Sequence, residues 1–168
     1  DVPFIKIPSA KITDKELLVA ACKTGKPVIV STGMSTLEEI DEAVGIVERY
    51  ASQYALMHCN SAYPAPQDQL NLRCIKTLQE RYKCPIGYSG HEQNLEPTVY
   101  AAVLGARIIE RHVTLDHAMW GTDQAASLEV LAMDMLRKRA KDVDSILGDG
   151  IKKVTDQEKE MRKKLRGY

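Results

Sequence analysis

Two segments, PIGYSGHE (85–92) and IIERH (108–112), decide the fold that we expect for this chain. Each is a short apolar strand with polar residues at its end, and an apolar, alanine-rich helix separates them. Parallel strands joined by such helices end at the same rim of a sheet. The polar side chains expected to converge at that rim are Ser89, His91, Glu110 and His112. Two imidazoles on neighbouring strand ends can bind a divalent metal and leave room for substrate oxygens. The alternative is two unrelated histidines in loops.

The same strand–helix unit recurs about every 25 to 30 residues. Apolar runs predict strands at 4–7, 27–31, 54–59, 86–88 and 107–113. Apolar periodicity and capping signals predict helices at 13–24, from 35 or 36 to about 47, and at 70–78, 97–104 and 128–147. The first helix is expected to begin with a capping box at 13–16. In the last helix, an apolar stripe is expected to pack in the core: Leu128, Leu131, Met135 and Leu136.

Strands that alternate with helices predict an α/β fold with a parallel sheet, and two architectures fit that pattern. An open, doubly wound sheet can be complete with five strands. A (β/α)8 TIM barrel needs eight strands and typically about 250 residues. Length alone favours the open sheet, because the chain has 168 residues. The strand ends favour the barrel, because every unit places polar groups at the same end and a barrel collects its site from many strands.

The polar residues at the earlier strand ends suit an anionic ligand. Lys6 lies on a short apolar strand, where a lysine is rarely buried without an anionic partner. The hydroxyl residues near the strand ends include Ser9, Ser31, Thr32, Ser61 and Tyr63. Together with a cation, hydroxyl groups can hold a phosphate or a carboxylate. Each hydroxyl taken alone also fits an ordinary turn or cap residue.

The composition predicts a cytoplasmic protein without nucleic-acid or membrane partners. Lys plus Arg and Asp plus Glu both number 23, so the formal net charge is zero. No apolar run approaches the roughly 20 residues that span a bilayer. The four cysteines, Cys22, Cys59, Cys74 and Cys84, have no C-x-x-C spacing and are expected to be reduced thiols.

Several strings in this order closely resemble the sialic acid (N-acetylneuraminate) synthase family, the phosphoenolpyruvate-dependent nonulosonate synthases. They are KIPS (6–9), KPVIVSTGM (26–34), HCNSAYP (58–64), IGYSGH (86–91), ERHVTLD (110–116) and GTD (121–123). The resemblance covers roughly residues 1–130. It implies a TIM barrel of which the C-terminal five β/α units are present in 1–150, with the three N-terminal units missing and a charged tail or linker at 151–168.

The resemblance also implies roles for individual residues. His91 and His112 are similar to the two protein ligands of a divalent cation, Mn2+ or Mg2+. The positions similar to substrate-binding residues are Lys6, Ser9, Ser31, Ser61, Ser89, Tyr63 and Asp123, of which Tyr63 and Asp123 match positions that face the sugar. The catalytic set that the resemblance implies is Glu110, Lys6, Tyr63 and Asp123, with Glu110 handling water or protons.

The implied activity is that of a transferase in sialic acid biosynthesis. It condenses phosphoenolpyruvate with N-acetylmannosamine or its 6-phosphate, and it forms N-acetylneuraminate or its 9-phosphate and phosphate. The resemblance also implies a homodimer. The alternatives are a synthase of another nonulosonate (legionaminate, pseudaminate or the deaminated KDN 9-phosphate) and a non-enzymatic five-stranded binding module that needs no metal.

Overall fold

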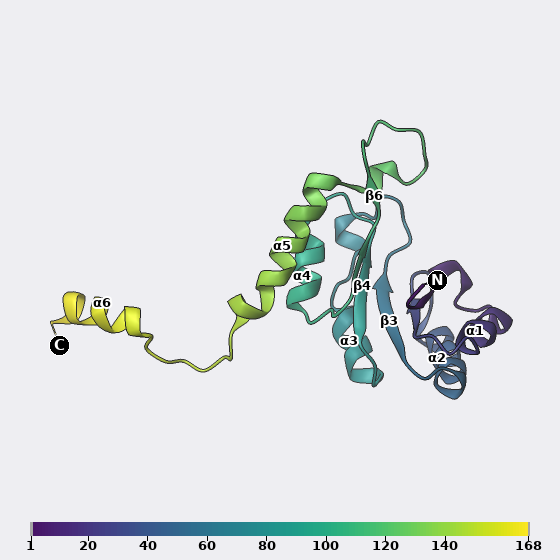
Figure 1. Ribbon diagram of the computed structural model, residues 1–168, viewed down its shortest axis with the longest axis horizontal. Coiled ribbons are helices and arrows are strands. Elements are labelled where there is room, and N and C mark those ends of the chain that lie inside the picture. Colours follow the sequence, from purple (N-terminus) through teal and green to yellow (C-terminus); the bar gives the residue numbers. More distant parts are fainter. Residues whose placement is uncertain (1, 168) are drawn as a thin grey trace.

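The computed structural model describes residues 2–167, and its centre is a five-stranded parallel sheet (Figure 1). The strands lie in the order β1-β2-β3-β4-β5, the order of the sequence. Their bounds are β1 Ile5–Ile7, β2 Val28–Ser31, β3 Tyr54–Cys59, β4 Ile86–Gly90 and β5 Ile109–Arg111. The order never reverses, and a doubly wound sheet requires a reversal at its switch point. The open-sheet alternative is therefore wrong.

The sheet is also strongly curved, because side chains from its two edge strands meet. Lys6 on β1 donates a hydrogen bond from Nζ to Oε1 of Glu110 on β5 over 2.9 Å. Four strand spacings separate β1 from β5, and in a flat sheet they would lie about 19 Å apart. A lysine and a glutamate cannot bridge that gap, so the five strands wrap into a parallel half-barrel. This curvature is consistent with part of a TIM barrel.

Helices cover the outer face of the half-barrel. They are α1 Lys15–Cys22, α2 Leu37–Tyr50, α3 Cys74–Arg81 and α4 Glu96–Val103. Outward strand residues such as Val28, Val30 and Leu56 are buried against apolar helix residues such as Leu18 and Val47. This alternation places the other strand residues, Lys6 and Glu110 among them, on the inner face.

The structure corrects several of the predicted helix ends. The capping box expected at 13–16 is absent, because Asp14 is the N-cap of α1 and its side chain accepts from the Leu17 N–H. The predicted helix at 70–78 begins only at Cys74, after a short 3-10 helix (η2, Gln67–Gln69). Thr36 does cap α2, in a complete capping box with Glu39. The signals thus mark the right regions, but the boundaries shift by a few residues, at α1 because Asp14 provides the cap.

The region after β5 differs most from the prediction. The expected strand at 107–113 is divided, and β6 (Val113–Thr114) leaves the main sheet to pair in parallel with β7 (Leu128–Glu129). The last helix therefore starts later, as α5 (Val130–Leu147). Leu128 and Leu136 are buried as expected, but Leu131 is 82% exposed and Met135 is 46% exposed. The prediction of a four-residue core stripe is thus wrong for half of its members.

The charged segment at the C-terminal side forms its own helix, α6 (Asp156–Arg166), capped by Thr155 and Glu158. None of its residues is buried, and an extended stretch separates it from the α/β body (Figure 1). No helix within residues 2–167 is both long and apolar enough to cross a membrane.

Candidate active site

The inner face of the half-barrel carries polar side chains at the carboxyl ends of its strands. Ser31 ends β2, and Ser89 lies near the end of β4 beside Glu110 of β5 in the register. Ser31 and Ser89 are each 1% exposed. The Ser31 hydroxyl has no hydrogen-bond partner among the described residues. A buried hydroxyl without a partner is costly, so this position fits a ligand that accepts a hydrogen bond from the Ser31 hydroxyl.

Lys6 and Glu110 form the ion pair that crosses the interior. Their side chains are 30% and 33% exposed, so both remain accessible from the rim. The anionic partner expected for a lysine on this strand is therefore Glu110. An incoming anion can share the ammonium group, which has three donors.

Glycine at position 33 lets three strand ends approach one another closely. The Gly33 N–H donates to Oγ of Ser9 over 3.0 Å. A Cβ at this position would collide with the Ser61 hydroxyl and lie 2.8 Å from the Ser9 hydroxyl. The structure thus brings Ser9 and Ser61 together across the loop after β2, and Cys59 lies within 3.9 Å of the Ser61 oxygen.

His91 is held by the loop that follows β3. Its Nδ1 lies 2.7 Å from the carbonyl oxygen of Asn60. A carbonyl can only accept, so Nδ1 carries the proton and Nε2 of the neutral ring keeps its lone pair. A hydrogen bond of this kind orients a histidine for metal binding through its other nitrogen. The Ala65 N–H also donates to the His91 carbonyl over 3.0 Å, which fixes the backbone.

His112 lies beside His91, with 5.2 Å between the ring centres. Tyr63 completes an aromatic cluster, because its ring centre is 4.1 Å from that of His91 and 5.6 Å from that of His112. Asp123 joins from the loop before β7, with Oδ2 3.4 Å from Nδ1 of His112. Residues far apart in the sequence are thus brought to one rim.

The two histidines have opposite pKa shifts. Burial opposes protonation of His91, but the contact with Cys59 and the Asn60 carbonyl outweigh it, so the pKa of His91 is raised. Burial and then the neighbouring charge of His91 lower the pKa of His112, against the attraction of Asp123. Both rings must be neutral to bind a metal. His112 is therefore prepared for that state, whereas a metal would compete with a proton at His91.

A two-histidine metal site fits these residues. No group of three or more His, Cys, Asp or Glu side chains within residues 2–167 is arranged to hold a metal ion. His91 and His112 supply two nitrogen donors, and an ion held by them would take its other ligands from water or substrate. Mn2+ and Mg2+ accept such oxygen ligands.

Sequence reasoning missed a buried network directly behind the histidines. Glu92 and Arg111 form an ion pair of 3.2 Å whose side chains are both fully buried. Arg111 lies between Glu110 and His112, so strand alternation points it to the helix side. That signal was present in the sequence, whereas nothing local indicated that Glu92 would be its partner.

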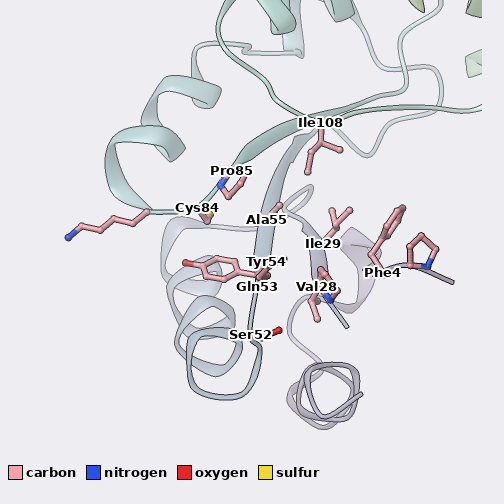
Figure 2. Close-up of a pocket in the computed structure, with 13 residues that line it drawn as sticks. Phe4, Val28, Ile29, Ser52, Gln53, Tyr54, Ala55, Cys84, Pro85 and Ile108 are labelled. Atoms are coloured by element: carbon pink, nitrogen blue, oxygen red, sulfur yellow. The ribbon is translucent and has the colours of Figure 1, made fainter. Parts of the chain in front are cut away.

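The amino ends of the strands surround a cavity that is mainly apolar, unlike the polar carboxyl ends. Its volume is about 580 Å³, and apolar residues form most of its lining. Figure 2 shows Phe4, Ile29, Ala55 and Ile108 around it. None of the predicted site residues lines this cavity.

Residues 1–152 match the NeuB family. This chain belongs to that family. The resemblance drawn from the sequence motifs is thereby confirmed. Among the curated relatives, the N,N'-diacetyllegionaminic acid synthase of Campylobacter jejuni is 38% identical over 158 residues, which cover 92% of this chain and 47% of the relative. The human N-acetylneuraminate-9-phosphate synthase is 34% identical over 166 residues, which cover 98% of this chain and 46% of the relative. This NeuB-family chain thus spans about half the length of the curated relatives it matches.

A solved structure shows the same architecture. The N-acetylneuraminic acid synthetase of Leptospira borgpetersenii, crystallised with citrate, superposes with a TM-score of 0.87 at 37% identity. The match covers 98% of this chain and 59% of that one. The parallel half-barrel of this chain is therefore shared with that structure.

Proposed function

We propose that this chain carries one side of the active site of a sialic acid-type synthase, a transferase that joins phosphoenolpyruvate to an amino sugar. The observation that supports it best is the convergence of Lys6, Glu110, His91 and His112 on one rim of the half-barrel. Anion-binding groups and a paired imidazole site lie within one interior, as a reaction between an anionic enol and a sugar aldehyde requires. The names of the relatives agree with this chemistry.

The proposed architecture is a (β/α)8 TIM barrel whose C-terminal five units are residues 1–150. Further strands would pair with the free edges of β1 and β5, and burying those edges would remove a site of unwanted strand pairing. Residues 151–168 would be a charged tail or linker, which agrees with the full exposure of α6. We further propose a homodimer in the cytoplasm.

The proposed phosphoenolpyruvate site includes Lys6, Ser9, Ser31, Ser61 and Ser89. Lys6 would donate to the anion while Glu110 holds the ammonium group in place. The unpartnered Ser31 hydroxyl would find its acceptor in the carboxylate or phosphate. Such preformed donors stabilise charge in the transition state without reorganising.

The proposed sugar site lies beside His112, on the accessible side of the rim. Tyr63 and Asp123 would contact the open-chain sugar, because both border His112 on the accessible side of the rim. His91 and His112 would hold Mn2+ or Mg2+, which when bound polarises an aldehyde oxygen as a Lewis acid.

In the proposed reaction, the methylene carbon of phosphoenolpyruvate forms a bond with the aldehyde carbon, whose oxygen takes up a proton. Positive charge develops at the enol carbon, and water adds there. Glu110 would accept the proton of that water, because its carboxylate is held beside Lys6, the proposed phosphoenolpyruvate ligand. The tetrahedral product then loses inorganic phosphate by carbon–oxygen cleavage and leaves a ketone.

The acceptor is N-acetylmannosamine or its 6-phosphate in this proposal, with the acceptors of legionaminate, pseudaminate and KDN 9-phosphate synthases as alternatives. The test is phosphate release from phosphoenolpyruvate by the natural protein that contains this sequence, with each acceptor in turn. We expect one acceptor to exceed the others by at least about tenfold in kcat/KM. A folded, metal-supplied protein that releases no phosphate with any acceptor would contradict the proposal and favour a non-enzymatic binding module.

A further inference from the structure

The buried network behind the rim joins the two strands that carry the histidines. Arg111 Nη1 lies 3.2 Å from Oε1 of Glu92, 3.0 Å from Oγ1 of Thr98 and 3.2 Å from the Asn94 carbonyl oxygen. Arg111 Nη2 donates to the Glu92 carbonyl. The Glu92 carboxylate also accepts from Thr98 over 2.7 Å and from the Tyr88 hydroxyl over 2.9 Å. One guanidinium group therefore holds both the side chain and the backbone of the loop after β4.

The backbone ladder between β4 and β5 ends one residue before each histidine. The last pair in the register of β4 and β5 is Gly90 with Arg111. His91 and His112 each lie one residue beyond it. Past that point, Arg111 and Glu92 continue the connection between the two strand ends through their side chains. Each member of the ion pair is the sequence neighbour of one histidine.

Gly90 supports this arrangement independently. A Cβ at Gly90 would lie 2.7 Å from Oε2 of Glu92 and 2.8 Å from Cε1 of Tyr88. The carboxylate therefore packs directly against the strand backbone, in space that only glycine leaves open.

A buried ion pair of this kind is poorly explained by stability. Desolvating two charges costs several kcal/mol, and apolar replacements are often neutral or stabilising. Its advantage is a fixed geometry, because a guanidinium group binds a carboxylate and carbonyl groups in defined directions. We propose that the Glu92–Arg111 pair is a positioning device that sets the separation of the His91 and His112 imidazoles and thereby the affinity of the rim for a divalent metal. This inference rests on the proposed metal site.

A surface cluster of the same chemistry provides the matched control. Arg81 on α3 forms an ion pair with Asp41 on α2, and the Tyr82 hydroxyl donates to the same carboxylate over 2.7 Å. The Arg81 and Asp41 side chains are 46% and 39% exposed. An arginine-to-lysine change therefore removes a guanidinium group that binds a carboxylate, both at Arg81 and at Arg111. Only Arg111 adjoins a proposed metal ligand.

The experiment measures Mn2+ binding to the metal-free natural protein by electron paramagnetic resonance, and the thermal midpoint of the same samples. We expect Arg111→Lys and Glu92→Gln to raise the Mn2+ dissociation constant about 10- to 100-fold. Arg81→Lys should leave it within about twofold. Tyr88→Phe removes one hydrogen bond to Glu92 and serves as the milder variant if the others do not fold. A purely structural pair would lower the midpoint and leave the affinity of the folded protein unchanged, which would overturn the inference.

Crystal structures of the same variants provide a readout that needs no metal. The distance between the His91 and His112 ring centres is 5.2 Å in the unchanged chain. If the unchanged protein binds no Mn2+, the proposed metal site and the effect on metal affinity both fail, and this distance then tests only whether the pair positions the two rings. A distance that shifts in Glu92→Gln, but not in Arg81→Lys, supports positioning. An unchanged distance in every folded variant refutes it.

Discussion

The two ends of the same five strands are built for different purposes. At the carboxyl ends the inner face carries Lys6, Glu110 and the two histidines, and several of these polar groups are buried or half-buried. At the amino ends the lining of the cavity is mainly apolar (Figure 2). Polar groups kept out of water are costly without partners, whereas apolar walls are stabilising when covered. The comparison favours the interpretation that the apolar amino ends support the fold, whereas the proposed chemistry at the carboxyl ends would be built at a cost in stability.

The largest expected effect is at the histidines. In the natural protein, His91→Ala should reduce kcat/KM by about 100-fold or more, because a Lewis acid contributes several kcal/mol to the transition state. Chelation should remove the activity of the unchanged protein, and added Mn2+ should restore it. Phosphate release with and without chelator measures both effects. Full activity of metal-free protein would contradict the proposed metal chemistry at the carboxyl ends of the strands.

The next effect separates the two substrates. Lys6→Ala should raise the KM for phosphoenolpyruvate about 10- to 100-fold, since hydrogen bonds to charged groups contribute roughly 1.5–3 kcal/mol. The KM for the sugar should change by less than about threefold. Steady-state kinetics with each substrate varied in turn measures the difference. An equal loss for both substrates would indicate a folding defect instead.

A change in the lining of the apolar cavity should affect stability and not substrate use. Ile29 is the register partner of Lys6 but lines the apolar cavity. Ile29→Ala should lower the free energy of unfolding by about 1–2 kcal/mol, less than for a fully buried isoleucine. Both KM values should stay within about twofold. Denaturant unfolding and kinetics on one preparation test this, and a selective rise in the KM for phosphoenolpyruvate would contradict it.

The smallest effect is expected in the outer helical layer. A change there provides a reference for the larger effects expected at the two ends of the strands. Arg81 and Tyr82 hold the pKa of Asp41 at about 2, below its ordinary 3.8. A depressed folded-state pKa stabilises the protein above the unfolded value, and the effect is lost as the pH falls through the folded value. Asp41→Asn should therefore lower the thermal midpoint at neutral pH by no more than about 3 °C.

The difference between Asp41→Asn and the unchanged protein should disappear as the pH falls from about 4 towards 2. Thermal scans across that pH range measure it, with Glu80→Gln, beside Arg81 on helix α3, as the control. A difference that persists at the lowest pH would show that packing, and not the charge, connects α2 to α3.

The sequence predicted the repeated strand–helix unit well, because buried parallel strands and amphipathic helices have distinct local patterns. It was less accurate where two local signals competed. The capping box expected at 13–16 does not form, because Asp14 caps α1 instead. The continuous apolar pattern from 128 onward did not reveal that Leu128 and Glu129 would pair with β6 instead. Strand pairing over such distances is a tertiary event, and no local propensity encodes it.

The sequence by itself determined which side chains belong to the strand ends, because a parallel strand and its polar end are adjacent in the chain. The motifs around Ser89, His91 and Glu110 also determined the family. Only the tertiary structure decided how these ends face one another. The curvature that joins Lys6 to Glu110 and the burial of Glu92 against Arg111 depend on the packing of all five strands and their helices. Both contacts link residues that are far apart in the sequence. The twist and curvature of the whole sheet set their separation in space, and no short stretch of sequence determines that twist and curvature.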